Sequence, residues 1–74
     1  MYYSFRKFRF GFEVKVKRES LGFTLHDMEV ITEINDSLLS RIECGKRVPM
    51  MGEFLALCNV LEMTPSKYFT KHKE

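Results

Sequence analysis

The sequence has little of what stabilises secreted or membrane proteins. Its 74 residues include two cysteines, two prolines and no tryptophan. Cys44 and Cys58 form no CxxC pair and have no ligand partners nearby in the sequence, which favours incidental thiols over a disulfide framework. No apolar run approaches the roughly 20 residues that cross a membrane, and the N-terminus lacks the apolar segment of a signal peptide. We therefore expect a cytoplasmic protein with no membrane partner.

The sequence also lacks the combinations of side chains that carry catalysis. It contains no glycine-rich phosphate loop, no carboxylate dyad and no nucleophile beside a base. His26 and His72 have no ligand partners at metal spacing and are expected in solvent. We therefore expect no enzymatic activity, no cofactor and no metal site.

Charge, by contrast, is present in two blocks of opposite sign. Residues 1–18 carry six basic side chains against one glutamate, a net charge of +5, whereas residues 19–33 carry four acidic side chains and no lysine or arginine. The basic residues at this end of the chain could bind the phosphates of a nucleic acid. A solvated face and a soluble tail are the simpler explanation of the same charge, so charge alone does not indicate binding to nucleic acid.

Helical spacing and capping residues predict three short helices in the first two thirds of the chain. The first covers 10–21, and the residues recurring along its inner face are Phe10, Val14, Lys17, Arg18 and Leu21. Thr24 and Asp27 form a capping-box pattern that opens a second helix over 25–32. Asn35 is a good N-cap for a third helix, which Gly45 would end.

Two further helices are predicted after Pro49. The apolar spacing of Met51, Phe54, Leu57, Cys58 and Leu61 indicates a helix over 52–61. Thr64–Pro65 is an N-cap followed by proline at the first helical position, which predicts a fifth helix over 65–71 that buries Tyr68 and Phe69. Only the segment 8–12 alternates as a strand does. The expected fold is a compact all-α domain of five helices at 10–71, with an extension at 1–9 and a tail at 72–74.

The segment from Phe23 to Pro49 resembles the phage-repressor (XRE, lambda-repressor-like or Cro-like) helix-turn-helix family. The end of this segment, Leu39-Ser-Arg-Ile-Glu-Cys-Gly-Lys-Arg-Val-Pro49, carries most of the resemblance, which extends over roughly residues 10–69. The resemblance implies a lambda-repressor-like fold that binds double-stranded DNA. The implied function is a sequence-specific transcriptional regulator, a repressor that acts as a homodimer on a palindromic operator.

The third helix would carry the DNA-reading surface. With Leu39 and Ile42 turned inward, the helical period turns Ser37, Ser40, Arg41 and Cys44 outward. The resemblance implies that bases are read by Asp36, Ser37 and Arg41. It also implies further contacts to DNA, mainly to phosphates, from Asn35, Ser40, Lys46 and Arg47. Arg18 and Glu43 match positions that form an internal ion pair in some members of the family.

Several residues depart from the family pattern and support a second interpretation. Glu29 replaces a small alanine and Glu33 a turn glycine, so that negative charge accumulates near the surface expected to meet phosphates. Val30 and Ile31 stand where the family has polar residues, which suggests a protein contact. The alternative is an antitoxin-like or other protein-interaction module that uses the same fold and binds a partner such as a toxin.

The first nine residues lie outside the motif. Aromatic and basic side chains alternate there, which fits a flexible DNA-binding arm poorly. These aromatic residues could pack on the domain, extend the first helix, or exchange between protomers. We expect packing or dimerisation rather than DNA contact.

Overall fold

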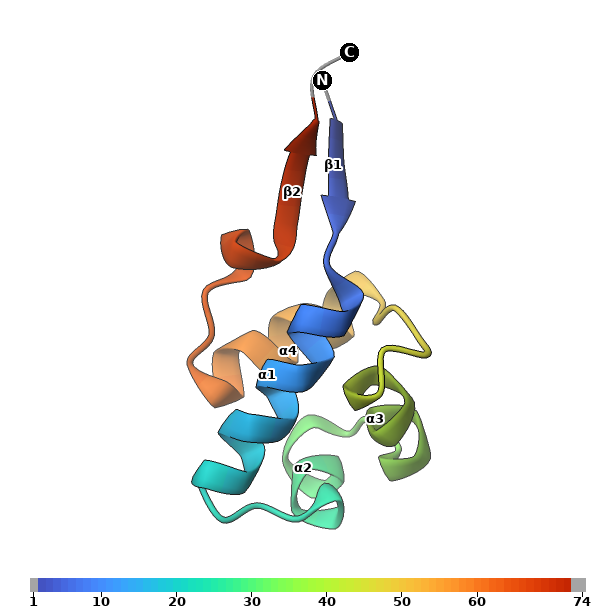
Figure 1. Cartoon of the computed structure of the whole chain (residues 1–74). Helices are drawn as coiled ribbons and strands as arrows, with labels where there is room; N and C mark the ends of the chain where they lie inside the picture. Colours follow the sequence, from blue (N-terminus) through green and yellow to red (C-terminus); the bar gives the residue numbers. More distant parts are fainter. Residues whose placement is uncertain (1, 73–74) are drawn as a thin grey trace.

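The computed structural model describes the backbone of residues 2–72 and the side chains of residues 4–70. Its elements in chain order are β1 (Tyr2–Phe5), α1 (Lys7–Ser20), α2 (Leu25–Thr32), α3 (Asp36–Glu43), α4 (Met51–Leu61), the 3-10 turn η1 (Pro65–Tyr68) and β2 (Phe69–His72). The four helices form the body of the molecule, and the two strands extend from one end of it (Figure 1). Within the described residues, no helix is long and apolar enough to span a membrane.

A single apolar core lies between the helices. Its buried members are Phe10, Val14, Met28, Ile34, Leu39, Ile42, Phe54, Leu57, Cys58, Leu61, Met63 and Tyr68. The predicted inner faces of α2, α3 and α4 are therefore largely correct. They are wrong for Met51, and on α1 for Lys17 and Leu21, all of which are exposed.

The fold is mostly helical, but the prediction of five helices is wrong. Residues 65–68 form one 3-10 turn, and the chain then straightens into β2, which pairs antiparallel with β1 so that Phe5 faces Phe69. The ring of Phe5 lies 5.4 Å from the ring of Phe69, 5.4 Å from that of Phe54 and 5.5 Å from that of Phe10, centroid to centroid. Burial of these rings together favours an extended chain over a fifth helical turn, because aromatic pairs add to area burial.

Of the aromatic residues at the beginning of the chain, Phe5 packs on the domain and Phe8 is exposed, whereas the side chains of Tyr2 and Tyr3 lie outside the described residues. Phe5 joins the aromatic cluster, and α1 begins at Lys7, so segment 8–12, which alternates as a strand does, is helical. The division into extension, domain and tail stays a prediction. Its first boundary falls inside α1, and residues 73–74 of the tail lie outside the described part of the chain.

A polar contact closes the side of the core where α1 meets η1. The buried Tyr68 hydroxyl donates to the Glu13 carboxylate, which also lies 3.8 Å from the Lys67 ammonium and 3.4 Å from the Arg9 guanidinium. The hydrogen bond from Tyr68, followed by the two cations, lowers the pKa of Glu13. Burial and the neighbouring carboxylate raise the pKa of Tyr68 above its usual range.

This contact makes part of the folding stability depend on pH. Because the pKa of Glu13 is lower in the folded chain than in the unfolded chain, the carboxylate stabilises the fold above the unfolded value of about 4.3. This contribution disappears as pH falls through the lowered folded value. Glu13→Gln should therefore lower the free energy of unfolding at pH 7 but much less at about pH 3.

Urea unfolding at the two pH values measures the difference. Glu62→Gln is the matched control, because Glu62 is an exposed glutamate at the C-cap position after α4. An equal loss for Glu13→Gln at both pH values would show that its charge does not favour the folded state.

Candidate nucleic-acid interface

The two-helix unit α2–α3 begins with a capping box, as the sequence predicts. The hydroxyl of Thr24 accepts from the backbone N–H of Asp27 at 3.0 Å, and the carboxylate of Asp27 accepts from the backbone N–H of Thr24 at 2.8 Å. Both bonds satisfy amide groups that the start of a helix leaves free. The backbone N–H of Thr24, followed by its hydroxyl, lowers the pKa of the Asp27 carboxyl.

The turn between α2 and α3 forces a strained backbone on Glu33. This residue ends α2 in the left-handed region, with φ of 62° and ψ of 19°. Such a conformation suits glycine and costs a residue with a Cβ about 1–2 kcal/mol. The strain falls on the position where the family pattern has glycine.

Glu33→Gly should therefore stabilise the fold by about 1 kcal/mol, since relief of strain outweighs the extra entropy of an unfolded glycine. Thermal unfolding followed by circular dichroism measures the change. Glu33→Ala removes the same charge but keeps the Cβ, so it should bring no comparable gain. If the two variants were stabilised equally, the carboxylate rather than the backbone would be the cause.

Helix α3 presents one buried and one open face. Its N-cap is Asn35, whose side-chain oxygen accepts from the N–H of Ser37 at 2.9 Å. Leu39 and Ile42 are buried, whereas Ser37 and Arg41 are exposed on the opposite side. Cys44, which is predicted to turn outward, is also exposed, and the predicted contacts Asp36 and Ser40 are partly exposed.

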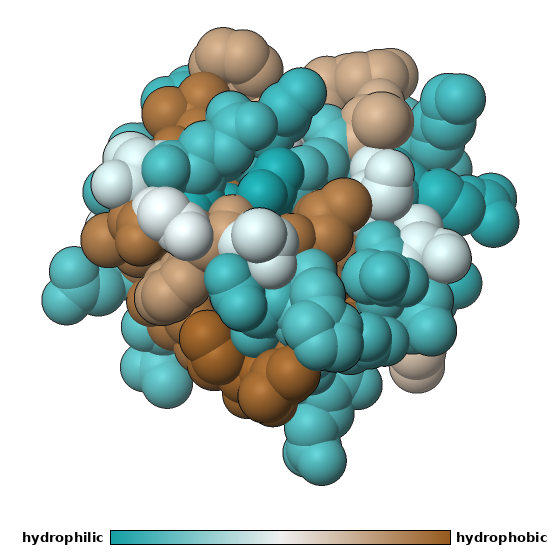
Figure 2. Space-filling model, turned by 90° about the horizontal axis from the view of Figure 1, so that it is seen from below, coloured by the Kyte–Doolittle hydropathy of each residue, from teal (hydrophilic) through white to brown (hydrophobic). Residues whose placement is uncertain are grey.

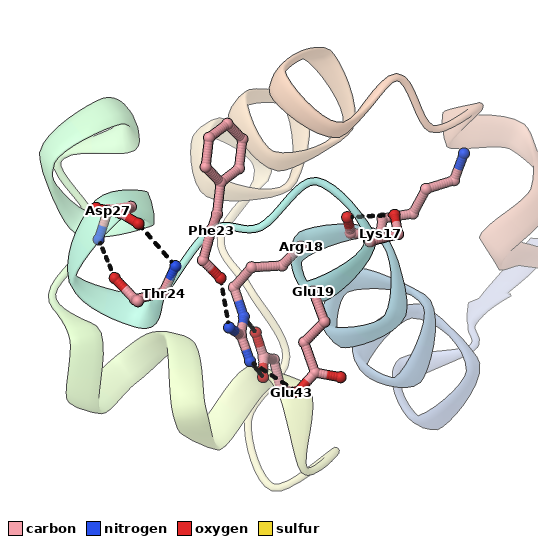
Figure 3. A network of polar contacts seen from close by, with 8 residues as sticks. Lys17, Arg18, Glu19, Phe23, Thr24, Asp27 and Glu43 are labelled. Carbon is pink, nitrogen blue, oxygen red and sulfur yellow. Dashed lines mark hydrogen bonds and ion pairs between the residues drawn. The ribbon is translucent and has the colours of Figure 1, made fainter.

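An ion pair between α1 and α3 fixes the end of α3. The Nε of Arg18 donates to one Glu43 oxygen at 2.7 Å and its Nη2 donates to the other at 3.2 Å, while Nη1 donates to the Phe23 carbonyl at 2.8 Å (Figure 3). The expected Arg18–Glu43 pair is thus present, and it also binds the loop before α2. The Glu43 hydrogen bonds raise the pKa of Arg18 despite its burial.

A glycine allows α1 and α3 to come close together. A Cβ placed on Gly11 would lie 2.2 Å from the carbonyl oxygen of Ile42 and 2.8 Å from that of Glu43. No other residue leaves room for this approach. Sequence reasoning did not single out Gly11, although a glycine inside a helix is a signal that something packs against it.

The two basic residues after α3 are placed differently. Lys46 is exposed, whereas Arg47 is half-buried, with its Nη2 at 3.9 Å from a Glu53 oxygen. Glu53 itself accepts from the backbone N–H of Met50 and so caps α4. Arg47 is therefore held close to the body, while Lys46 is free to reach outward.

Acidic groups also lie at the start of α3. The carboxylate of Glu29 accepts from the backbone N–H of Asp36 at 3.3 Å, and its other oxygen lies 3.6 Å from Nδ1 of His26. Glu29, which replaces a small residue of the family pattern, thus acts as a second cap on α3. Among the described residues, no group of three or more His, Cys, Asp or Glu could hold a metal ion.

The open face of α3 is not covered by the N-terminal segment. Strand β1 lies at the far end of the molecule from α2, beyond the start of α1 (Figure 1). It pairs with β2 there and contacts the core through Phe5. The surface around Ser37 and Arg41 is therefore open in the described chain.

Comparisons with known proteins agree with this geometry. A sequence profile described as "Helix-turn-helix domain" matches residues 9–67. The fold is similar to the crystal structure of the restriction-modification controller protein C.AhdI from Aeromonas hydrophila, with a TM-score of 0.71 and 20% sequence identity over 81% of this chain and 91% of that chain. No curated protein sequence matches the chain.

Proposed function

The chain belongs to the helix-turn-helix domain family, of the phage-repressor (XRE, Cro-like) type, and we propose that it is a sequence-specific repressor of transcription. The family and the fold support a DNA-binding transcriptional regulator. The observation that carries the proposal is the open face of α3, with Ser37 and Arg41 in solvent opposite the buried Leu39 and Ile42. A helix with one free polar face fits the width of the major groove.

The proposed roles follow from the position of each side chain. Arg41 donates to O6 and N7 of guanine, Asp36 accepts from N4 of cytosine, and Ser37 contacts either kind of base edge. Lys46 contacts phosphates. Arg47 also contacts phosphates after its ion pair with Glu53 breaks. Asn35 and Ser40 are supporting contacts, because the side chain of Asn35 already caps α3.

The proposal includes a homodimer on a palindromic operator. Two copies related by a two-fold axis would place their α3 helices in successive major grooves, about 34–36 Å apart. Repression would result from occupying the site that the polymerase needs. The proposal also places the protein in the cytoplasm and gives it no catalytic activity and no cofactor.

Two substitutions separate base reading from phosphate binding. Arg41→Ala should lose about 1–3 kcal/mol on the preferred duplex and accept more base changes at one position. Lys46→Ala should weaken binding to all duplexes alike and reduce the dependence of log Kd on log salt by about one unit. Selection from a random duplex library, followed by salt titrations, measures both. If neither change altered binding to any duplex, the proposed interface would be wrong.

A second candidate function is an antitoxin-like or other protein-interaction module. It is favoured by the exposed Val30 and Ile31 on α2 and by the acidic side chains beside them. Co-expression with the product of a neighbouring reading frame, followed by pull-down, tests it. A stable complex formed by a chain that selects no duplex would favour this function over repression.

A further inference from the structure

Two of the exposed apolar surfaces of the described chain have no role in DNA reading and lie on different helices. The first is the solvent side of α1, here called the α1 face, where Phe12 and Val16 are 65% and 47% exposed. The second is the solvent side of α2, here called the α2 face, where Val30 and Ile31 are 67% and 47% exposed. Apolar side chains grouped on one helix face, rather than scattered singly, mark sites of contact with another protein.

The α1 face is hollowed and basic at its rim. A shallow hollow of about 370 Å³ is lined by Phe12, Val16, Glu13, Lys17 and Lys67. The single carboxylate in this lining is already engaged, because it contacts the Tyr68 hydroxyl and two cations. The ammonium group of Lys17 extends away from the Arg18–Glu43 network (Figure 3), so that it remains available to a partner.

The α2 face has the opposite charge. Between residues 19 and 40 the sequence contains no lysine or arginine, and the exposed apolar pair is flanked by Asp27, Glu29 and Glu33. The carboxylates of Asp27 and Glu29 also accept bonds from helix starts, and Glu33 is exposed. Seen from the end of the molecule where α2 lies, apolar side chains reach the surface among hydrophilic ones (Figure 2). One face is thus an exposed apolar pair with an acidic border, and the other is a shallow apolar hollow with a basic border.

We propose that the α2 face of one copy docks on the α1 face of a second copy. Val30 and Ile31 would enter the hollow beside Phe12 and Val16, while the acidic border meets Lys17 and Lys67. The occupant is a second copy because the chain itself carries two apolar faces whose borders have opposite charge. This inference goes beyond the proposed function and does not depend on it.

The symmetry of this contact differs from that of a two-fold dimer. Because the two faces are different surfaces of the same chain, each docked copy still has one face free, and the contact is head-to-tail. Two apolar side chains on each side take part, so the contact belongs to the small, weak class of interfaces. On DNA, such a contact would make binding to adjacent sites cooperative, because the duplex raises the effective concentration of neighbours.

A pair of complementary variants tests the head-to-tail arrangement. Phe12→Glu places a negative charge in the hollow and prevents docking on the α1 face. Val30→Lys prevents docking through the α2 face. Both positions are largely exposed, so both variants should fold. Each variant alone should have no self-association through these faces. Their mixture should form a one-to-one complex, because each supplies the face that the other lacks.

Amide chemical shifts measure this complex at about millimolar concentration, where weak contacts are populated. In isotope-labelled Val30→Lys titrated with unlabelled Phe12→Glu, shifts are expected around Phe12, Val16 and Lys17 and not around α2. High salt should reduce them, since exposed charges are screened. The unlabelled double variant Phe12→Glu/Val30→Lys is the control, because it has neither face and should give no such shifts.

The results that would overturn the proposal are equally specific. Absence of α1 shifts in the mixture would do so, as would equal α1 shifts with the double variant. Both titrations are carried out without DNA, so their results are valid whether or not the chain selects a duplex. Conversely, failure to select a duplex would count against the proposed function and leave this contact standing.

Discussion

Arg18→Met is expected to lower the free energy of unfolding by about 3–5 kcal/mol, because it leaves a buried carboxylate without its partner. The side chain of Glu43 is only 6% exposed and that of Arg18 only 10% exposed. In the wild-type chain the guanidinium satisfies both carboxylate oxygens and the Phe23 carbonyl. A domain of this size is stable by about 4–11 kcal/mol, so the loss would consume much of its stability.

Urea unfolding of the single variant and of the double variant Arg18→Met/Glu43→Met separates the charge from the packing. If the unpaired carboxylate causes the loss, removing it as well should recover most of the stability, because two apolar side chains replace two buried charges. If Arg18→Met lowered the free energy of unfolding by less than about 1 kcal/mol, the pair would be screened by water, as ion pairs at an exposed surface are.

Gly11→Ala is expected to destabilise the fold by about 3 kcal/mol, through a clash that side-chain rotation cannot relieve. The new Cβ would meet backbone carbonyls of α3 at 2.2 Å and 2.8 Å, so the two helices would have to move apart. Overpacking in a closed site costs about 1–3 kcal/mol, and backbone neighbours place this site at the upper end. Denaturant unfolding measures the loss.

Gly52→Ala is the matched control for this substitution. Gly52 also lies in a helix, but a Cβ there would have no atom within 4 Å. Alanine should therefore stabilise α4 by about 0.5–1 kcal/mol, which is the usual gain over glycine in a helix. If Gly11→Ala behaved in the same way, the close approach of α1 and α3 would be refuted.

Both substitutions disturb the same feature of the molecule, which is the position of α3 on α1. Arg18 holds the end of α3 through Glu43, and Gly11 sets how closely that end approaches α1. The open face with Ser37 and Arg41 depends on both contacts. A partly folded variant should therefore lose any DNA selection even though it keeps every proposed base-reading residue.

The helix starts in the middle of the chain could be predicted because their causes are local. Thr24 and Asp27 bond to each other's backbone within one turn, and Asn35 caps α3 through the N–H of Ser37. Neither cap depends on a distant residue. The outward direction of Ser37 and Arg41 likewise follows from the helical period once Leu39 and Ile42 turn inward.

The ends of the chain could not be predicted in this way, because their partners lie far apart in the sequence. Strand β2 exists because Phe69 pairs with Phe5 and packs its ring against Phe54, and no residue within 65–71 signals that pairing. The exposure of Lys17 and Leu21 could not be predicted either. Helical spacing indicates which residues share a helix face but not how much of that face is buried. Local patterns thus predicted the caps of α2 and α3, the two-helix unit and its family. The strand pair, the close approach at Gly11 and the contact of Glu13 with Tyr68 could be seen only in the folded chain, because each depends on groups that are far apart in the sequence.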